Sequence, residues 1–257
     1  MPTGTRKLTA LHTLGVVNVS ASGTKSILED LKNITQVSGI NKSEKLFSAI
    51  SVLVHLESLS VWLDKDSQGC LDDISLRLKS LGSLKLHGLG DKLPEWSGKH
   101  LTKLTKIDLE MTTVMKQPEE TGTTENASSQ GKKGVMMLLG MLPELCILRI
   151  CAKQFQDGEL IVKVIKNAIE DNSFEKVKVL EIACGSSAKV SFGNKAMKKL
   201  EQLKIDCSIG SKYEFAGLEH LPELKEVWLK GSYDDALKQD LQSQLDKHEK
   251  RPVLKLE

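Results

Sequence analysis

One arrangement of apolar residues recurs along the chain and limits the folds that it can adopt. The arrangement places four apolar residues at steps of three, three and two, as in Leu53, Leu56, Leu59 and Val61. A shorter copy runs from Val177 to Ile182, and the complete copies have as their third members Leu14, Leu59, Leu84, Ile107, Leu148, Leu203 and Val227. Third members of neighbouring copies lie 23 to 25 residues apart between Leu59 and Ile107. A fixed period of roughly 20–50 residues predicts a solenoid of stacked repeats.

The final step of two in each copy is the signature of a β-strand, because alternate residues of a strand share one face. Leu59 and Val61 would then point inward, while Ser58, Ser60 and Trp62 point outward. This period and this strand pattern are typical of leucine-rich repeats. The expected fold class is α/β: a leucine-rich-repeat solenoid with a curved parallel β-sheet on the concave side and helices and loops on the convex side.

Two segments between the strands are predicted to be helices. Asp157–Glu170 carries an apolar stripe at helical spacing, and Ser43–Val52 carries a weaker one. The rhythm breaks between Ile107 and Leu148, which are 41 residues apart. The excess includes Gln117–Gly134, whose sequence QPEETGTTENASSQGKKG is rich in small and polar residues. This insert is predicted to be a mobile loop outside the solenoid.

The C-terminal part is expected to close the solenoid. Ser232 and Asp235 form a helix-start pair, an apolar residue then recurs at every fourth position from Leu237 to Leu245, and Pro252 would end the helix. The predicted organisation is about nine irregular repeats in residues 1–231, with the insert at 117–134, followed by a capping helix and tail in residues 232–257. Repeat-like sequence begins within the first ten residues, which predicts a chain cut inside a longer solenoid.

The charge balance and the cysteines argue against several classes of function. Lys and Arg number 36 against 34 Asp and Glu, which gives no electrostatic reason to expect nucleic acid as a partner. The five cysteines include no Cys-x-x-Cys pair, as expected for a reducing compartment. No apolar run approaches the ~20 residues of a membrane span, and the N-terminus lacks a signal segment. The chain is therefore predicted to be cytoplasmic, with no membrane span.

No catalytic or metal-binding motif is found in the sequence. A phosphate-binding Gly-x-x-x-x-Gly-Lys-Ser/Thr loop and a Gly-x-Ser-x-Gly motif are both absent. The six histidines have no metal-ligand spacing; His87 and His100, for example, have no nearby His or Cys partner. The sequence therefore predicts a protein that is not an enzyme and that holds no cofactor and no metal.

The outward-facing strand positions are the candidate site. As a set they form the predicted concave face, where Trp and Arg side chains could serve as anchors for a protein partner. The candidates are Trp62, Lys85, His87, Lys106, Asp108, Glu110, Arg149, Glu181, Lys204, Asp206, Glu226, Trp228 and Lys230. The C-terminal half is expected to dominate, with Trp228 as anchor. The alternatives are a merely solvated sheet surface, or a Trp228 ring that packs against its sheet neighbours or the cap helix.

Three segments carry a resemblance to a known family: LTALHTLGVVNV near Leu8–Val19, LHGLGDKLPEWSGKHLTKLTKIDLE at Leu86–Glu110 and LEHLPELKEVWLKG at Leu218–Gly231. They resemble the repeat region of plant coiled-coil nucleotide-binding leucine-rich-repeat receptors, the NLR disease-resistance proteins. The resemblance implies pathogen recognition and autoinhibition in the defence response. The implied partner is a pathogen effector, a host protein or the nucleotide-binding module of a receptor. That module's phosphate-binding loop is missing here, so no nucleotide site is carried over.

Two other functions remain open from the sequence. One is the leucine-rich-repeat substrate-receptor arm of a ubiquitin ligase, which would need an F-box-like helical segment ahead of the repeats. The other is an extracellular receptor, suggested by the Asn-x-Ser/Thr triplets at Asn18, Asn33, Asn41 and Asn126. The chain lacks both a signal segment and the Asn-x-Leu-x-Gly-x-Ile-Pro pattern of secreted plant repeats, which favours chance for these triplets.

Overall fold

The computed structural model describes the backbone of residues 13–18 and both backbone and side chains of residues 55–63, 78–91, 93, 101–116, 134–163, 173–208 and 211–257. The helix predicted at Ser43–Val52 lies outside these residues. The predicted insert also lies outside them, except for Gly134, which precedes the short helix α3, Val135–Gly140.

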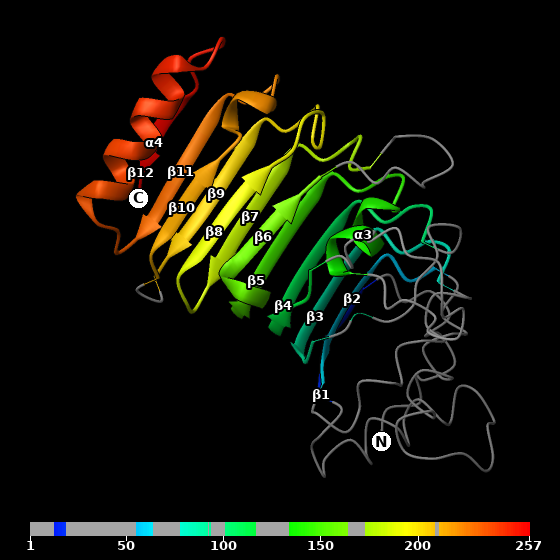
Figure 1. Cartoon of the computed structure of the whole chain (residues 1–257). Coiled ribbons are helices and arrows are strands. Elements are labelled where there is room, and N and C mark those ends of the chain that lie inside the picture. The colour runs from blue at the N-terminus through cyan, green and yellow to red at the C-terminus, as the bar shows by residue number, and fades with distance from the viewer. Residues whose placement is uncertain are drawn as a thin grey trace, which may run out of the picture.

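Within the described residues, nine strands form one parallel sheet in the order β1-β2-β3-β4-β5-β7-β9-β11-β12. Its members are β1 Thr13–Asn18, β2 Ser58–Trp62, β3 Ser83–Leu89, β4 Lys106–Val114, β5 Ile147–Phe155, β7 Val179–Cys184, β9 Gln202–Cys207, β11 Glu226–Gly231 and β12 Val253–Leu256. Neighbouring strands follow the chain order around a curved sheet (Figure 1). Each strand between β1 and β12 thus hydrogen-bonds to the strand before it and the strand after it in this order.

The repeated apolar residues hold these strands in register. The third apolar residue of each copy pairs with its counterpart on the next strand, as Leu59 with Leu84 and Leu203 with Val227. All four are at most 1% exposed, so they form one continuous row inside the core. A second tie lies just before the strands: the backbone N–H groups of Gly82 and Ser83 both donate to Glu57 O, at 2.8 and 2.9 Å. Equivalent paired bonds recur at the starts of β4, β5, β7, β9 and β11.

A second sheet lies across the core from the first. It has the order β10-β8-β6, with β6 Glu159–Val162, β8 Ala188–Phe192 and β10 Tyr213–Ala216, and its pairs are parallel. Alternate residues of these strands enter the same buried cluster as the concave strands. In the described residues the convex side also contains α3 and the 3-10 turns η4 Gln156–Gly158 and η5 Leu218–His220.

The helix predicted over Asp157–Glu170 is wrong for residues 157–163, and residues 164–170 lie outside the described part of the chain. Residues Glu159–Val162 form β6, in which Leu160 and Val162 are buried and Ile161 is 40% exposed. This burial has the period of two that a strand requires. Leu160 and Val162 stand beside Val190 and Phe192 of β8, so stacking on the next repeat selects a strand.

The helix expected after Ser232 is α4, Asp235–Lys247. Its N-cap is Asp234 rather than Ser232, because Asp234 Oδ1 accepts a hydrogen bond from Leu237 N at 2.8 Å. The helix ends at Lys247, five residues before Pro252, so this proline does not end it. The expected tail contains β12, which pairs in parallel with β11.

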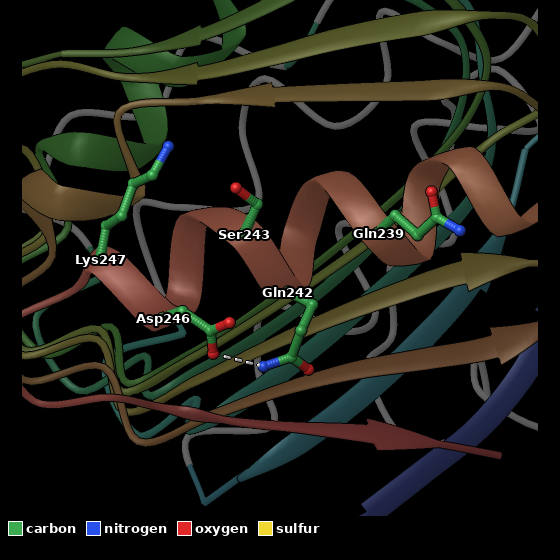
Figure 2. Close-up of a pocket in the computed structure, with 5 residues that line it drawn as sticks. All are labelled: Gln239, Gln242, Ser243, Asp246 and Lys247. Atoms are coloured by element: carbon green, nitrogen blue, oxygen red, sulfur yellow. Dashed lines mark hydrogen bonds between the residues drawn. The ribbon is translucent and has the colours of Figure 1, made fainter.

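Helix α4 covers the end of the solenoid (Figure 1), with Leu237, Leu241 and Leu245 buried against the core. Its outer side is polar, and Figure 2 shows the side chains that line a shallow hollow there. They are Gln239, Gln242, Ser243, Asp246 and Lys247. Gln242 donates a hydrogen bond to Asp246 across one helical turn, at 2.7 Å. A helix with one apolar side and one polar side is suited to cap a repeat stack.

Candidate protein-interaction face

All thirteen predicted site residues lie on the face of the large sheet that points away from the core. The strand register arranges this face in three rows that run across the strands. The first row contains Ser58, Ser83, Lys106, Ile147, Val179, Gln202, Glu226 and Val253. The middle row contains Ser60, Lys85, Asp108, Arg149, Glu181, Lys204, Trp228 and Lys255. The third row contains Trp62, His87, Glu110, Cys151, Ala183, Asp206 and Lys230.

The middle row holds an alternating series of charges, which we term the charge ladder: Lys85, Asp108, Arg149 and Glu181. Asp108 Oδ2 lies 3.8 Å from Lys85 Nζ and 3.7 Å from Arg149 Nη1, and Arg149 Nε lies 3.2 Å from Glu181 Oε1. Asp108 is only 6% exposed, so its charge depends on these cations for compensation. The ladder sums to zero net charge, and its members contact one another across β3, β4, β5 and β7.

Trp228 lies next to last in the middle row, before Lys255, and is half-buried by its neighbours. Its indole N–H donates to Glu226 Oε2 at 2.9 Å, and Lys255 Nζ lies 4.5 Å from the ring centroid. Lys204 is on the neighbouring strand β9, and its Nζ lies 5.8 Å from that centroid. The ring is therefore held by its sheet neighbours, as the alternative interpretation of Trp228 expected, while it still lies on the solvent-facing side.

Glu226 is the hydrogen-bonding centre of this end of the face. Its Oε1 accepts from Lys255 Nζ at 2.6 Å, and its Oε2 accepts from Trp228 Nε1 and from Gln202 Nε2, the latter at 3.2 Å. The hydrogen bond from Lys255 is the main cause that holds the pKa of Glu226 below its ordinary value. Neither Gln202 nor Lys255 was among the site residues predicted from the sequence. Gln202 has the same alternation as Glu226 and could have been included, whereas Lys255 could be placed only once β12 was known.

Trp62, at the opposite end of the third row, is the more exposed of the two rings at 44%. It stacks on His87, with 5.1 Å between the ring centroids and 23° between the planes. His87 Nδ1 is in turn 2.9 Å from Glu110 Oε2. The Trp62 ring therefore stacks on a side chain of β3 that is itself bound by a carboxylate of β4, which leaves a preorganised aromatic surface open to solvent.

A hollow of about 170 Å³ lies beside Trp228, and we term it the C-terminal hollow. It is lined by Glu181, Lys204, Ile205, Asp206, Trp228, Lys230 and Glu257. Burial raises the pKa of Asp206, but hydrogen bonds from Ser208 and the positive charges of Lys230 and Arg149 together leave that pKa below its ordinary value. The lining comes from β7, β9, β11 and the residue after β12, so the register of the sheet builds the hollow.

No group of three or more His, Cys, Asp or Glu side chains among the described residues could hold a metal ion. The four described cysteines are free thiols, and burial raises the pKa of the Cys151 thiol on the concave face, which disfavours its reactive thiolate. In the described segments, no helix is both long and apolar enough to cross a membrane.

Comparison with known proteins agrees with this geometry. Residues 129–254 match the family described as "Leucine-rich repeat region". No curated protein matches the chain. The matched residues include β5 to β11, the second sheet and the capping helix. Residues 129–254 are therefore a leucine-rich repeat region, and the chain has the α/β fold of a leucine-rich-repeat solenoid.

Proposed function

We propose that the chain is a protein–protein interaction module that binds its partner with the concave face. The observation that carries this proposal is the presence of two tryptophan rings at opposite ends of one solvent-facing sheet surface. Each ring is held by side chains of the same sheet: Trp62 by His87 of the next strand, and Trp228 by Glu226 of its own strand and Lys255 of β12. Large amphipathic rings held in this way are typical binding hot spots, and solenoids commonly bind partners in their concave surface.

The charges of the face favour a protein partner over a nucleic acid. The charge ladder alternates in sign and compensates itself within 4 Å. A surface that binds nucleic acid needs an excess of unpaired cations along its length. A self-compensated strip flanked by aromatic rings instead suits a partner surface of mixed polarity.

The finer proposal is that this module is the repeat region of a plant intracellular immune receptor. It would act in the cytoplasm in pathogen recognition and autoinhibition, with an effector, a host protein or a receptor's nucleotide-binding module as partner. Support comes from the three receptor-like segments of the sequence. Two of them also supply the face: Leu86–Glu110 supplies His87 and Glu110, and Leu218–Gly231 supplies Glu226 and Trp228.

The test is co-purification of the tagged full chain from plant cells with mass spectrometry of the retained proteins. Trp62→Ala should reduce partner retention roughly 30-fold, the effect of losing an anchor worth about 2 kcal/mol. The matched control is Ile161→Ala, because Ile161 is similarly exposed, at 40%, but lies on the second sheet. Equal retention by both variants would show that the concave face is not the binding surface. Retention of ubiquitin-ligase subunits would favour a substrate-receptor arm over an immune receptor.

A further inference from the structure

The strand β12 is the last of the large sheet, and among the described residues no strand pairs with its outer edge. Val253 N donates to Lys225 O, just before β11, at 2.9 Å, and Glu257 N donates to a carbonyl of β11 at 2.8 Å. Backbone groups of successive residues in a strand point to opposite edges, so the N–H and C=O groups of Leu254 and Leu256 point outward. In the part of the chain that the structure describes, no hydrogen bond to these four groups is found.

The turn before β12 holds this strand in place. Arg251 has a φ of 45°, in the left-handed region that residues other than glycine rarely adopt. Its N–H donates to His248 O at 3.0 Å, and His248 is only 4% exposed, with its Nε2 3.2 Å from Leu221 O. Pro252 follows and is buried. These contacts leave the outer edge of β12 free and fix it in an extended conformation before any ligand arrives.

The side chains of β12 also leave the edge accessible. Val253 is 58% exposed on the concave side, and Leu256 is 46% exposed on the side of the sheet that faces the core. Proteins often protect an edge strand with a lysine. Here Lys255 is drawn back toward β11, where its Nζ lies 2.6 Å from Glu226 Oε1. The strand itself therefore carries no uncompensated side-chain charge, and its unpaired backbone lies between exposed apolar groups.

Backbone donors and acceptors at strand spacing are complementary to the backbone of another extended chain. A second copy of this protein is one source of such a chain. In the antiparallel register that pairs Leu254 with Leu256 of the copy, however, each Lys255 lies directly opposite the other, and like charges in that position are destabilising. A segment of a different protein has no such restriction, so the charge on β12 favours a partner of another sequence.

We propose that β12 binds an extended segment of the partner protein, which joins the large sheet as an additional strand. The segment exchanges backbone hydrogen bonds with Leu254 and Leu256, places an apolar residue beside Leu256, and carries no cation opposite Lys255. Val253 and Lys255 already belong to the rows of the concave face, so the added strand extends that face. The proposal rests on the proposed function, because it requires a protein partner, and it adds how the chain of that partner is bound.

The test uses a peptide in place of the unidentified partner: acetyl-Ser-Val-Thr-Val-Thr-Val-Ser-amide, which alternates apolar and polar residues. It is titrated into the full chain labelled with ¹⁵N-leucine, up to about 10 mM, because a few backbone hydrogen bonds give only millimolar affinity. We expect saturable downfield shifts of the amide signals of Leu254 and Leu256, each assigned by its loss in the Leu→Val variant. The signal of Leu203, on an inner strand, should not move.

Two N-methylated forms of the peptide are matched controls, because a methyl group removes an N–H donor and leaves the side chains unchanged. In an added strand the N–H groups that point to β12 belong to alternate residues, either the valines or the residues between them. Methylation of one of these two sets should weaken binding by about fivefold or more, and methylation of the other set should have little effect.

Variants of the chain locate the effect. Leu256→Pro removes the outward N–H, which an edge strand tolerates, whereas Leu256→Ala keeps it, and both remove the leucine side chain. Followed by the Leu254 signal, the peptide should bind Leu256→Pro about fivefold more weakly than Leu256→Ala, as expected for the loss of one hydrogen bond.

The proposal is overturned if no saturable shift occurs, if the two methylated peptides bind equally, or if the proline and alanine variants bind equally. A dimer in gel filtration that Leu256→Pro dissociates and Leu256→Ala does not would assign the edge to a second copy and also overturn it. The methylated peptides need only the wild-type chain, so a variant that does not fold still leaves a decision. A missing partner in the co-purification counts against the binding module, whereas a partner that Leu256→Pro and Leu256→Ala retain equally counts against the added strand alone.

Discussion

The Tyr213 hydroxyl joins the two sheets, and its removal provides the most direct test of the fold. The hydroxyl accepts a hydrogen bond from the backbone N–H of Cys184, at the end of β7, at 2.6 Å. It also donates to Asp206 O of β9, at 3.3 Å. Tyr213 is 5% exposed and Cys184 is fully buried, so water cannot replace either bond. The substitution Tyr213→Phe therefore leaves a buried N–H donor without its acceptor.

The expected cost is about 2 kcal/mol of unfolding free energy, since a buried unsatisfied donor costs roughly 1–3 kcal/mol and the longer bond to Asp206 adds little. Urea unfolding followed by circular dichroism should show a midpoint lower by roughly 0.7–1 M, for a denaturant slope of about 2–3 kcal/mol/M. Burial is the main cause that raises the pKa of Tyr213 far above its ordinary value of 10.0. The folded state therefore loses stability as pH rises above about 10, where the unfolded chain ionises this group. Tyr213→Phe should remove that part of the alkaline loss.

The chain provides its own control, because Tyr233 is the other of its two tyrosines. Tyr233 packs partly against the core, and no hydrogen bond of its hydroxyl is found among the described residues. Tyr233→Phe should change the unfolding free energy by no more than about 0.5 kcal/mol. If the two variants unfold at the same urea concentration, the Tyr213 hydroxyl does not join the sheets and the account of this corner is wrong.

Three further predictions test the register, a buried thiol and the cap. Leu203→Ala should lower the free energy of unfolding in urea by about 2–5 kcal/mol, because Leu203 is fully buried. Lys204→Ala should lower it by less than about 0.5 kcal/mol. If Lys204→Ala were the more destabilising of the two, the strand register would be off by one. Burial raises the pKa of Cys207 from 9.0 to about 11, so up to about 3 kcal/mol of stability should be lost as pH rises from 9 to 11, and Cys207→Ala should flatten that pH dependence. Asp234→Ala should lower the thermal midpoint by removing a cap worth about 1 kcal/mol, and an unchanged midpoint would place the helix start elsewhere.

The concave strands could be predicted from the sequence because their apolar pattern fits only one secondary structure. In Leu59 and Val61 the step of two fits a strand, and the preceding steps of three place the chain at the same point of every repeat. Once the buried residues of a strand are known, the residues between them must lie on its opposite face, so Trp62 and its counterparts had to point to solvent. The ion pairs among these residues follow from the register, because residues directly opposite each other on neighbouring strands lie within reach of long side chains.

The convex side could not be predicted in the same way. The run from Leu160 to Ile169 is apolar at positions that fit a helix, and Leu160 and Val162 also fit a strand. Periodicity alone does not separate the two when a run is short. The choice depends on β8, which belongs to the following repeat and presents Val190 and Phe192 beside β6. The pairing of β6 with β8 is a tertiary contact, which the sequence of this run does not reveal by itself.

The C-terminal strand was missed for a related reason. Val253–Leu256 is four residues long and follows Pro252, so nothing local indicates a strand. Its pairing is provided by β11, whose outer edge would otherwise be unpaired: Val253 N donates to Lys225 O at 2.9 Å, and Glu257 N donates to Leu229 O at 2.8 Å. Without β12, Trp228 would lie on the last strand of the sheet. With β12 present, Lys255 covers the ring and engages Glu226.

The contacts within the face separate residues that hold it together from residues that remain free to bind. Arg149 is half-exposed, yet it lies between Asp108 and Glu181, and Asp108 is nearly buried. Removing Arg149 would leave that carboxylate with Lys85 alone at 3.8 Å, so a loss of binding in such a variant would first reflect a loss of stability. Lys204 and Lys230 have no such role, because no described carboxylate depends on either through an ion pair. We therefore expect charge substitutions at Lys204 and Lys230 to alter partner binding without the loss of stability that follows removal of Arg149.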